Sequence, residues 1–381
     1  MSNKSNLQRS FVTAIIVLLV LLPIAIPNII AQEKYEWLSK TPMPTSRYNF
    51  GLAVVDGRIF AIGGTGSEGK TTLATNEMYD PQTDTWTTKT QMPTPRSKFA
   101  IATYQNKIYS IGGSNTFANE VYNPQTDKWE SKASLPTQYN RNFLNAHTVK
   151  DKIYVISGKT NKFSMYSPNS PEVNIYDPKT DTWTQGTQIP HPVCKYASTL
   201  VNDKIYVFGG IDYTPPINVY NYTQIYDTTT DTWSFGTPIP EQTYDCESSA
   251  TSGDVTPKGI YVLGGVINET PSYVTQIYSP EEDRWTFGTS FPKFFSGGFA
   301  NMNVSLSYPS GVVTVDDVLY AISGTKTLKY VPVESETPSP SITPTPTPTL
   351  EAFPTTIAVV SIATIAVVGI GIFAYWKKYR K

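Results

Sequence analysis

The chain has 381 residues, of which 39% are hydrophobic and 13% aromatic. This composition is typical of a globular body with a large core and excludes a disordered chain. The formal net charge is −1 and no basic block lies in the body, so nucleic-acid binding is not expected. Only two Cys and two His occur, so the sequence offers no Cys/His framework for a metal, and no cofactor is predicted.

Residues 1–31 are predicted to be a secretion signal. Lys4 and Arg9 form a positively charged start, and the apolar run Phe11–Ile26 follows. Ala31 provides a small residue for cleavage. An uncleaved N-terminal anchor is the alternative interpretation of the same pattern.

Residues 32–333 contain an internal repeat. One unit consists of an apolar strand, a glycine pair, a variable stretch and the motif Tyr-Asp-Pro-x-Thr-Asp-x-Trp. The motif tyrosine precedes its tryptophan by seven positions in five copies, and a proline follows each tryptophan by seven more. The copies are Tyr79/Trp86/Pro93, Tyr122/Trp129/Pro136, Tyr176/Trp183/Pro190, Tyr226/Trp233/Pro240 and Tyr278/Trp285/Pro292. Such recurrence indicates a repeat architecture.

Each unit is predicted to begin with a β-hairpin that ends at the glycine pair. Gly51–Ile62 holds two β-rich runs around Asp56-Gly57, which is a strong hairpin signal. Equivalent turns are predicted at Gln105-Asn106, Lys150-Asp151, Asn202-Asp203, Pro257-Lys258 and Asp316-Asp317.

The two ends of the repeat are complementary. Trp37 precedes Pro44 by the same seven positions, yet no glycine pair or motif tyrosine lies before it. The last unit has its strand and glycine (Val318–Gly324) but no tryptophan. The N-terminal segment is therefore expected to supply the outer strand of the last unit, which closes a ring and leaves no open edge.

These features resemble the kelch repeat, in which a glycine pair precedes a Tyr and a Trp in units of about fifty residues. The resemblance covers Glu36–Val333. It implies an all-β fold: a six-bladed kelch-type β-propeller closed by an N-terminal strand. Kelch propellers include enzymes, extracellular binding proteins and intracellular adaptors, so the fold alone does not give a function.

Three arginines are candidate ligand-binding residues. Arg47, Arg96 and Arg141 each lie 16 residues before the first position of a glycine pair, which predicts that they start the innermost strands of blades 1 to 3. The corresponding positions are taken to be Val193 in blade 4 and Asp245 in blade 5. An arc of guanidinium groups at the channel mouth would bind a carboxylate or sulfate. The alternative is a scaffold role, in which each arginine bonds to neighbouring blade backbone.

Tyrosines in the long loops on the same face are further ligand-binding candidates. Exposed Tyr offers a large contact area with a polar tip, as protein or sugar recognition requires. The alternative is that these loops only cap the ring. The candidates are Tyr213, Tyr220, Tyr222 and Tyr273.

Cys194 and Cys246 are expected at equivalent innermost-strand positions of blades 4 and 5. Outside the cell they would form a disulfide if their Cα atoms lie within about 7 Å. Two buried free thiols are the alternative.

Three sequons are N-glycosylation candidates in an exported domain. They begin at Asn221, Asn268 and Asn303. Because the motif is short and also arises by chance, it does not establish occupancy.

The C-terminal region is predicted to anchor the protein in a membrane. Residues 334–352 are rich in Thr and Pro and are expected to form an extended stalk. Residues 353–376 contain no charged side chain and are long enough for one transmembrane helix. Residues 377–381 are expected to form a basic cytoplasmic tail. The expected topology is single-pass type I in the cell membrane, with the propeller extracellular.

No nucleophile–base constellation or metal site emerges from the sequence, so an enzyme is not predicted and no catalytic residue is assigned. The expected function is binding of a protein or glycan ligand outside the cell, in adhesion or recognition. The alternative is a sugar-processing propeller enzyme, sialate mutarotase-like or sialidase-like, acting on an anionic carbohydrate. The sequence does not indicate an oligomeric state.

Overall fold

The computed structural model describes residues 34–161, 167–292 and 310–333. These residues form β-strands, turns and loops, and within them no helix is long and apolar enough to span a membrane. The predicted signal (1–31), stalk (334–352), transmembrane helix (353–376) and tail (377–381) lie outside the described residues.

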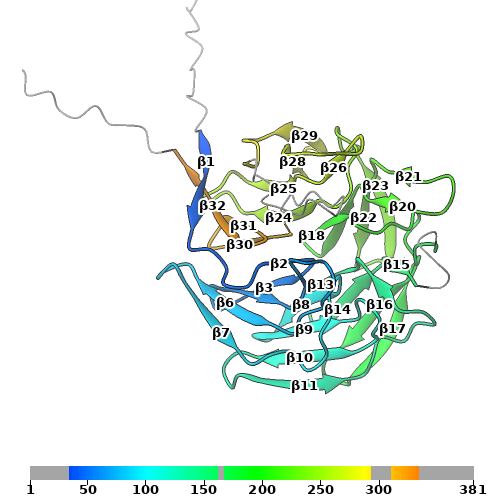
Figure 1. Cartoon of the computed structure of the whole chain (residues 1–381). Helices are drawn as coiled ribbons and strands as arrows, with labels where there is room; N and C mark the ends of the chain where they lie inside the picture. The colour runs from blue at the N-terminus through cyan, green and yellow to red at the C-terminus, as the bar shows by residue number, and fades with distance from the viewer. Residues whose placement is uncertain (1–33, 162–166, 293–309, 334–381) are drawn as a thin grey trace, which may run out of the picture. The chain divides into compact units, whose positions relative to one another are not determined.

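Six four-stranded antiparallel sheets form the blades of a ring (Figure 1). From the innermost strand outward, blade 1 contains β3 (Gly51–Val55), β4 (Arg58–Ile62), β6 (Asn76–Asp80) and β7 (Thr85–Lys89); blade 2 contains β8 (Ala100–Tyr104), β9 (Lys107–Ile111), β10 (Asn119–Asn123) and β11 (Lys128–Lys132); blade 3 contains β13 (Asn145–Val149), β14 (Lys152–Ile156), β16 (Val173–Asp177) and β17 (Thr182–Gly186). Blade 4 contains β18 (Ala197–Val201), β19 (Lys204–Phe208), β22 (Thr223–Asp227) and β23 (Thr232–Gly236); blade 5 contains β24 (Glu247–Thr251), β25 (Gly259–Leu263), β28 (Thr275–Ser279) and β29 (Arg284–Phe287); blade 6 contains β30 (Gly311–Val315), β31 (Val318–Ser323), β32 (Lys326–Pro332) and β1 (Tyr35–Lys40).

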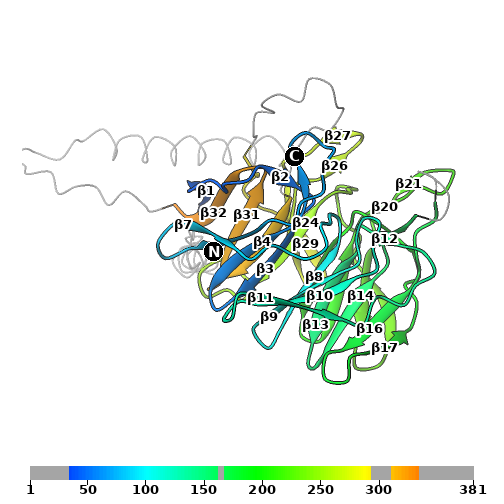
Figure 2. The same ribbon diagram turned by 60° about the horizontal axis from the view of Figure 1, so that its bottom comes forward.

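Four small sheets, each made of two strands of two residues, lie in the loops near one end of the blades. Figure 2 shows this for β20, β21, β26 and β27. They are β2 (Arg47–Tyr48) with β5 (Thr65–Gly66), β12 (Arg141–Asn142) with β15 (Lys159–Thr160), β20 (Ile211–Asp212) with β21 (Asn218–Val219), and β26 (Val266–Ile267) with β27 (Thr270–Pro271).

The predicted N-terminal closure of the ring is confirmed. β1 pairs with β32 in blade 6, and the two strands lie side by side in Figure 1 in blue and orange. Trp37 lies opposite Tyr330, just as Trp86 lies opposite Tyr79 in blade 1. The N-terminal and C-terminal segments of the chain together form blade 6 and contain the same Tyr–Trp cross-strand pair as the other blades.

Most of the predicted inner hairpins have the expected tight turn. Asp56 and Gly57 have φ values of 49° and 71°, the left-handed backbone that a two-residue hairpin turn requires. Blade 5 differs from the prediction. Its inner hairpin is connected by a loop over 252–258 instead of a tight turn at Pro257-Lys258, and this loop turns at Gly253 with φ of 100°.

The motif Tyr, Asp and Trp connect neighbouring blades. In blade 1, Asp84 accepts hydrogen bonds from the Tyr79 hydroxyl at 2.6 Å and from the backbone N–H of Thr41 at 2.9 Å. Trp86 Nε1 donates to the carbonyl of the same Thr41 at 2.9 Å. Blades 2 to 5 repeat this contact with Tyr122/Asp127/Trp129 on Thr90, Tyr176/Asp181/Trp183 on Ala133, Tyr226/Asp231/Trp233 on Thr187, and Tyr278/Asp283/Trp285 on Thr237. The motif thus satisfies one backbone N–H and one C=O across each of these five seams.

Candidate functional site

The three arginines are buried, with exposed fractions of 0% for Arg47, 0% for Arg96 and 1% for Arg141. They do not start the innermost strands, and that prediction is wrong. Arg47 and Arg141 lie in the short strands β2 and β12, and Arg96 lies in the loop before β8. Each arginine precedes the first residue of its innermost strand by four positions. The position 16 residues before the glycine pair therefore lies in the segment that leads into the strand, not in the strand itself.

Each arginine is held by its own blade. Arg47 forms an ion pair with Glu77 and donates to the Ala61 carbonyl at 2.8 Å. Arg96 forms an ion pair with Glu120, which is equally buried.

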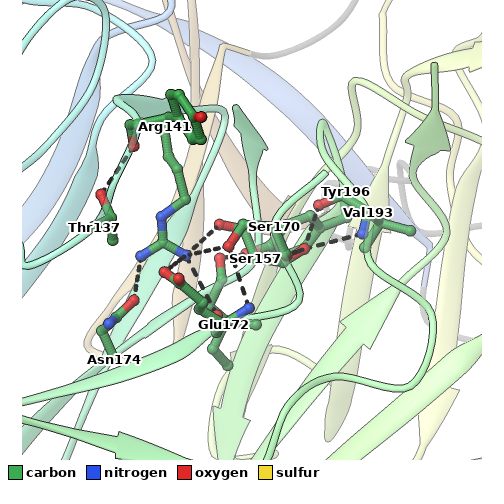
Figure 3. Close-up of polar contacts among 10 residues, drawn as sticks. Thr137, Arg141, Ser157, Ser170, Glu172, Asn174, Val193 and Tyr196 are labelled. Carbon is green, nitrogen blue, oxygen red and sulfur yellow. Dashed lines mark hydrogen bonds and ion pairs between the residues drawn. The ribbon is translucent and has the colours of Figure 1, made fainter. Parts of the chain in front are cut away.

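Arg141 is bonded in the same manner, as Figure 3 shows. It donates to the Asn174 side chain, to the Ser157 carbonyl at 3.0 Å and to Ser170 Oγ at 3.3 Å. Because these acceptors come from the strand and loops of blade 3, the guanidinium fixes the loop that enters the blade.

Blades 4 and 5 replace the arginine and its partner together. Gln224 occupies the β22 position that corresponds to Glu77, and it exchanges two hydrogen bonds with the His191 backbone at 2.9 and 3.0 Å. Gln276 does the same with the Glu241 backbone. The residue equivalent to the arginines is Val193 in blade 4 and Thr243 in blade 5, where Asp245 was expected.

The equivalence rests on one backbone hydrogen bond that recurs between blades. The second glycine of a pair donates to the carbonyl of Arg96, Arg141, Val193 or Thr243 in the next blade. In blades 1 to 3 the arginine occurs together with a buried carboxylate or amide partner, and in blades 4 and 5 a glutamine that bonds to backbone replaces both residues. This paired replacement favours the scaffold alternative for the arginine arc.

A cavity of about 330 Å³ lies where the innermost strands begin. Five residues at equivalent positions of blades 1 to 5, each two after the arginine position, line it with positive φ. They are Asn49 (53°), Lys98 (57°), Phe143 (54°), Lys195 (54°) and Asp245 (55°). Backbone hydrogen bonds join Lys98 to Asn49, Phe143 to Lys98 and Asp245 to Lys195, for example from Lys98 N–H to the Asn49 carbonyl at 2.9 Å. The left-handed backbone at this position is therefore part of the ring architecture, and the side chains it carries differ from blade to blade.

Two ammonium groups and one ring meet at this cavity. Lys98 Nζ lies 4.6 Å and Lys195 Nζ 5.0 Å from the centroid of the Phe143 ring. Lys195 forms an ion pair with Asp245 at 2.6 Å. Burial lowers the pKa of Lys195, but the Asp245 carboxylate outweighs it and the net shift is upward.

Lys98 forms no ion pair with any residue in the described ranges. Burial, with the neighbouring charge of Lys195, lowers the pKa of Lys98. Its ammonium group is thus a cation of the cavity that the scaffold does not neutralise.

Glu247 at the start of β24 also lines the cavity. Its carboxyl group has no hydrogen bond or ion pair to another described residue. Burial and the nearby Asp245 raise the pKa of Glu247 to about 8. Near neutral pH the Glu247 carboxyl is consequently protonated in large part and able to donate a hydrogen bond.

The innermost strands carry both apolar and polar side chains toward the axis of the ring. Leu52, Ile101 and Val312 face the cavity from blades 1, 2 and 6. Blade 3 instead contributes His147, whose Nε2 lies 2.7 Å from Ser198 Oγ of blade 4, and burial lowers the pKa of His147 to about 4. Apolar side chains from blades 1, 2 and 6 thus line part of the cavity, while a contact between neutral His147 and Ser198 joins the innermost strands of blades 3 and 4.

The candidate tyrosines are half-buried, not fully exposed, and they do not form one surface. Tyr213 lies near the cavity, with the Lys159 ammonium 4.1 Å from its ring centroid. Tyr220 and Tyr222 stack on each other at 5.1 Å, and His191 stacks on Tyr222 at 4.3 Å.

The fourth candidate, Tyr273, lies in the loop before β28, and its carbonyl accepts a hydrogen bond from Phe291 N–H at 2.7 Å. This backbone contact joins the loop before β28 to the segment that follows β29.

The predicted disulfide is not formed: Cys194 and Cys246 are buried free thiols. They are not at equivalent positions, because Cys194 follows the arginine-equivalent residue by one and Cys246 follows its own by three. The blade 5 equivalent of Cys194 is Tyr244, which makes the matching backbone bridge.

Two of the sequons lie on the surface, since Asn221 and Asn268 are exposed in loops. Asn303 lies outside the described residues. Among the residues that the structure describes, no cluster of three or more His, Cys, Asp or Glu side chains is arranged to hold a metal ion.

The cavity residues Lys98, Phe143, Lys195 and Glu247 were not identified from the sequence. The first three share a signal that sequence reasoning could have used, because they lie two positions after the arginine-equivalent residue of each blade. Glu247 carries no such signal.

Comparisons with known proteins agree with this fold. Kelch repeat protein C2 of Cowpox virus (strain GRI-90 / Grishak) is 27% identical over 188 residues, which cover 49% of this chain and 32% of the viral protein. Kelch-like protein 36 of Bos taurus is 27% identical over 289 residues, covering 70% of this chain and 43% of the bovine protein. The chain therefore matches less than half the length of either relative.

The solved structure of YjhT superposes with a TM-score of 0.57 at 14% identity, covering 76% of this chain and 94% of that one. At this identity the likeness concerns the fold alone. The model of the Attractin/LZTR1 beta-propeller family matches residues 59–280, more than half of the chain. With its repeat motif, its six blades and these matches, the chain belongs to the Attractin/LZTR1 beta-propeller family and is a kelch-repeat β-propeller.

Proposed function

We propose that the chain is a cell-surface binding module whose propeller lies outside the cell and receives a protein or glycan ligand at the mouth of its central channel. One observation carries the proposal. The repeat's arginines are all engaged by the scaffold, whereas Lys98, Phe143 and Glu247 line an open cavity, and neither Lys98 nor Glu247 forms an ion pair with another residue that the structure describes. Polar side chains that are not engaged in holding the blades together are available to bind a ligand.

The fold class supports binding as the activity. Kelch propellers commonly serve as protein-interaction modules, and the rigid ring presents loops of variable length around one opening. The predicted signal, stalk and transmembrane helix would display the propeller outside the cell. Their expected order gives a single-pass type I topology with a basic cytoplasmic tail.

A second function rests on Glu247. A carboxyl group with a raised pKa in a cavity suits general acid–base catalysis, which favours the alternative of a sugar-processing enzyme acting on an anionic carbohydrate. A ligand that binds in stoichiometric amount and is recovered unchanged supports the binding module. Conversion of the ligand at a rate that falls in Glu247→Gln supports the enzyme.

Two measurements test the binding proposal. Protease added to intact cells should degrade the propeller if it is displayed outside, and permeabilised cells give the control. The purified whole chain should then bind a member of an array of glycans, surface polymers and cell-surface proteins. Protection of the propeller in intact cells, or no binding on the array, would refute the respective half of the proposal.

A further inference from the structure

We propose that the central cavity binds a small hydroxylated carboxylate, of the size of one sugar-acid unit, with its carboxylate at Lys98 and a hydroxyl group at Glu247. This inference rests on the proposed function and names the chemistry of its ligand. A terminal acidic residue of a glycan would present such a group.

The charge balance of the cavity favours a ligand with one negative charge. Lys195 is neutralised by Asp245 at 2.6 Å, and Glu247 is largely uncharged near neutral pH. Within the part of the chain that the structure describes, Lys98 then leaves one positive charge without an ion pair, over the Phe143 ring. A carboxylate at hydrogen-bond distance from this ammonium would form a charge-assisted bond.

The shape and lining of the cavity favour a small ligand with hydroxyl groups. A volume of about 330 Å³ lies at the lower end of small-molecule sites and suits one sugar ring better than a folded partner. The lining combines the Phe143 ring with the side chains of Asn49 and Asn145. A sugar acid has the matching surfaces, since its C–H face packs on an aromatic ring and its hydroxyl edge bonds to amides.

Glu247 makes the site sensitive to pH. The ionisable groups that line the cavity with Glu247 are Lys98 and Lys195 from blades 2 and 4, Asp245 and Cys246 from its own blade, and Tyr48 and Tyr196 from blades 1 and 4. As the pH rises through about 8, Glu247 loses the proton it donates, and its negative charge repels a carboxylate held in the same cavity. Lys98, whose pKa is lowered, also loses charge at high pH. Both changes weaken the binding of a carboxylate as the pH rises.

The test is calorimetric titration of the full chain in a mild non-ionic detergent. The ligands are glucuronate, galacturonate, N-acetylneuraminate and neutral glucose. We expect at least one acid to bind at pH 6.5 at least tenfold more tightly than glucose. Lys98→Gln should weaken this binding at least tenfold, whereas the control Lys128→Gln on the exposed strand β11 should leave it unchanged. Glu247→Gln should reduce the loss of affinity between pH 6.5 and pH 9.

Two results would overturn the inference. One is that no acid binds more tightly than glucose, and the other is that Lys98→Gln binds the acid as the wild type does while thermal unfolding shows that it is folded. If the whole chain binds an array protein but none of these acids, the inference fails and the proposed function stands. If an acidic peptide side chain from that protein requires Lys98, the cavity recognises a carboxylate but not a sugar acid, which also contradicts the inference as stated.

Discussion

Blade 4 provides a natural replacement for the buried Arg96–Glu120 ion pair of blade 2. In blade 4 the two positions are Val193 and Gln224, and the glutamine bonds the backbone of His191. Glu120 already accepts the backbone N–H of Thr94 at 3.3 Å, the position that corresponds to His191. Replacing Arg96 by Val and Glu120 by Gln should therefore transplant the blade 4 arrangement into blade 2.

The magnitudes follow from burial. Arg96→Val alone leaves the Glu120 carboxylate buried without its cation, which costs about 3–5 kcal/mol. The double variant removes that charge, and its Gln side chain is free to donate to the Thr94 carbonyl that Arg96 Nε now occupies at 3.2 Å. Its remaining cost is about 1–2 kcal/mol, from the smaller volume of Val.

Thermal unfolding of the purified whole chain, followed by circular dichroism, measures both variants. At about 2 °C per kcal/mol for a large domain, Arg96→Val should lower the unfolding midpoint by about 6–10 °C, and the double variant should recover at least half of this loss. A double variant as unstable as Arg96→Val would refute the equivalence of the two blades. A single variant with an unchanged midpoint would refute the scaffold role of Arg96.

Three further predictions concern the blade seams and the glycine pair. Tyr122→Phe removes a 2.6 Å hydrogen bond to the Asp127 carboxylate and should cost about 1.5–3 kcal/mol in chemical denaturation, whereas an unchanged denaturation midpoint would contradict the seam contact. Gly113→Ala should lower the midpoint more than a typical surface change, because φ is 100° and the new Cβ would lie 2.7 Å from Phe99 Cβ; a midpoint within error of the wild type would rule out that crowding. Burial would raise the pKa of Asp84, but the hydrogen bonds it accepts lower it to about 2, so this carboxylate contributes stability above its unfolded value near 4 that is lost as the pH falls toward 2. Asp84→Asn should therefore show a shallower fall of the unfolding midpoint across that pH range, and parallel curves would contradict this.

The blades and the ring closure were predictable because they depend on contacts that recur at fixed spacing. A Tyr and a Trp seven positions apart become a cross-strand pair in the outer hairpin of each of blades 1 to 5, and Trp37 and Tyr330 complete that pair across the chain ends. The longer loop in the inner hairpin of blade 5 was not predictable in the same way. Its loop carries insertions around Gly253, and the sequence pattern does not show where the strand stops.

The site was less predictable because it depends on how blades meet at the axis. Counting from the glycine pair located Arg47, Arg96 and Arg141 correctly in the repeat but not the direction of their side chains, which turn into their own blades. Lys98 and Phe143 come from different blades and become neighbours only when blades 2 and 3 pack together. Both follow the arginine position of their own blade by two residues, but this spacing alone does not show that the two side chains meet.

Binding of the whole chain to the array, measured for two variants side by side, tests most directly whether the channel mouth is the binding site. One variant is Lys98→Gln, which changes the cavity, and the other is the double variant Arg96→Val with Glu120→Gln, which changes only the scaffold of the same blade. We predict that the ligand is lost from Lys98→Gln and retained by the double variant. Loss from the folded double variant with retention by Lys98→Gln would contradict the assignment and return the ligand to the arginine arc.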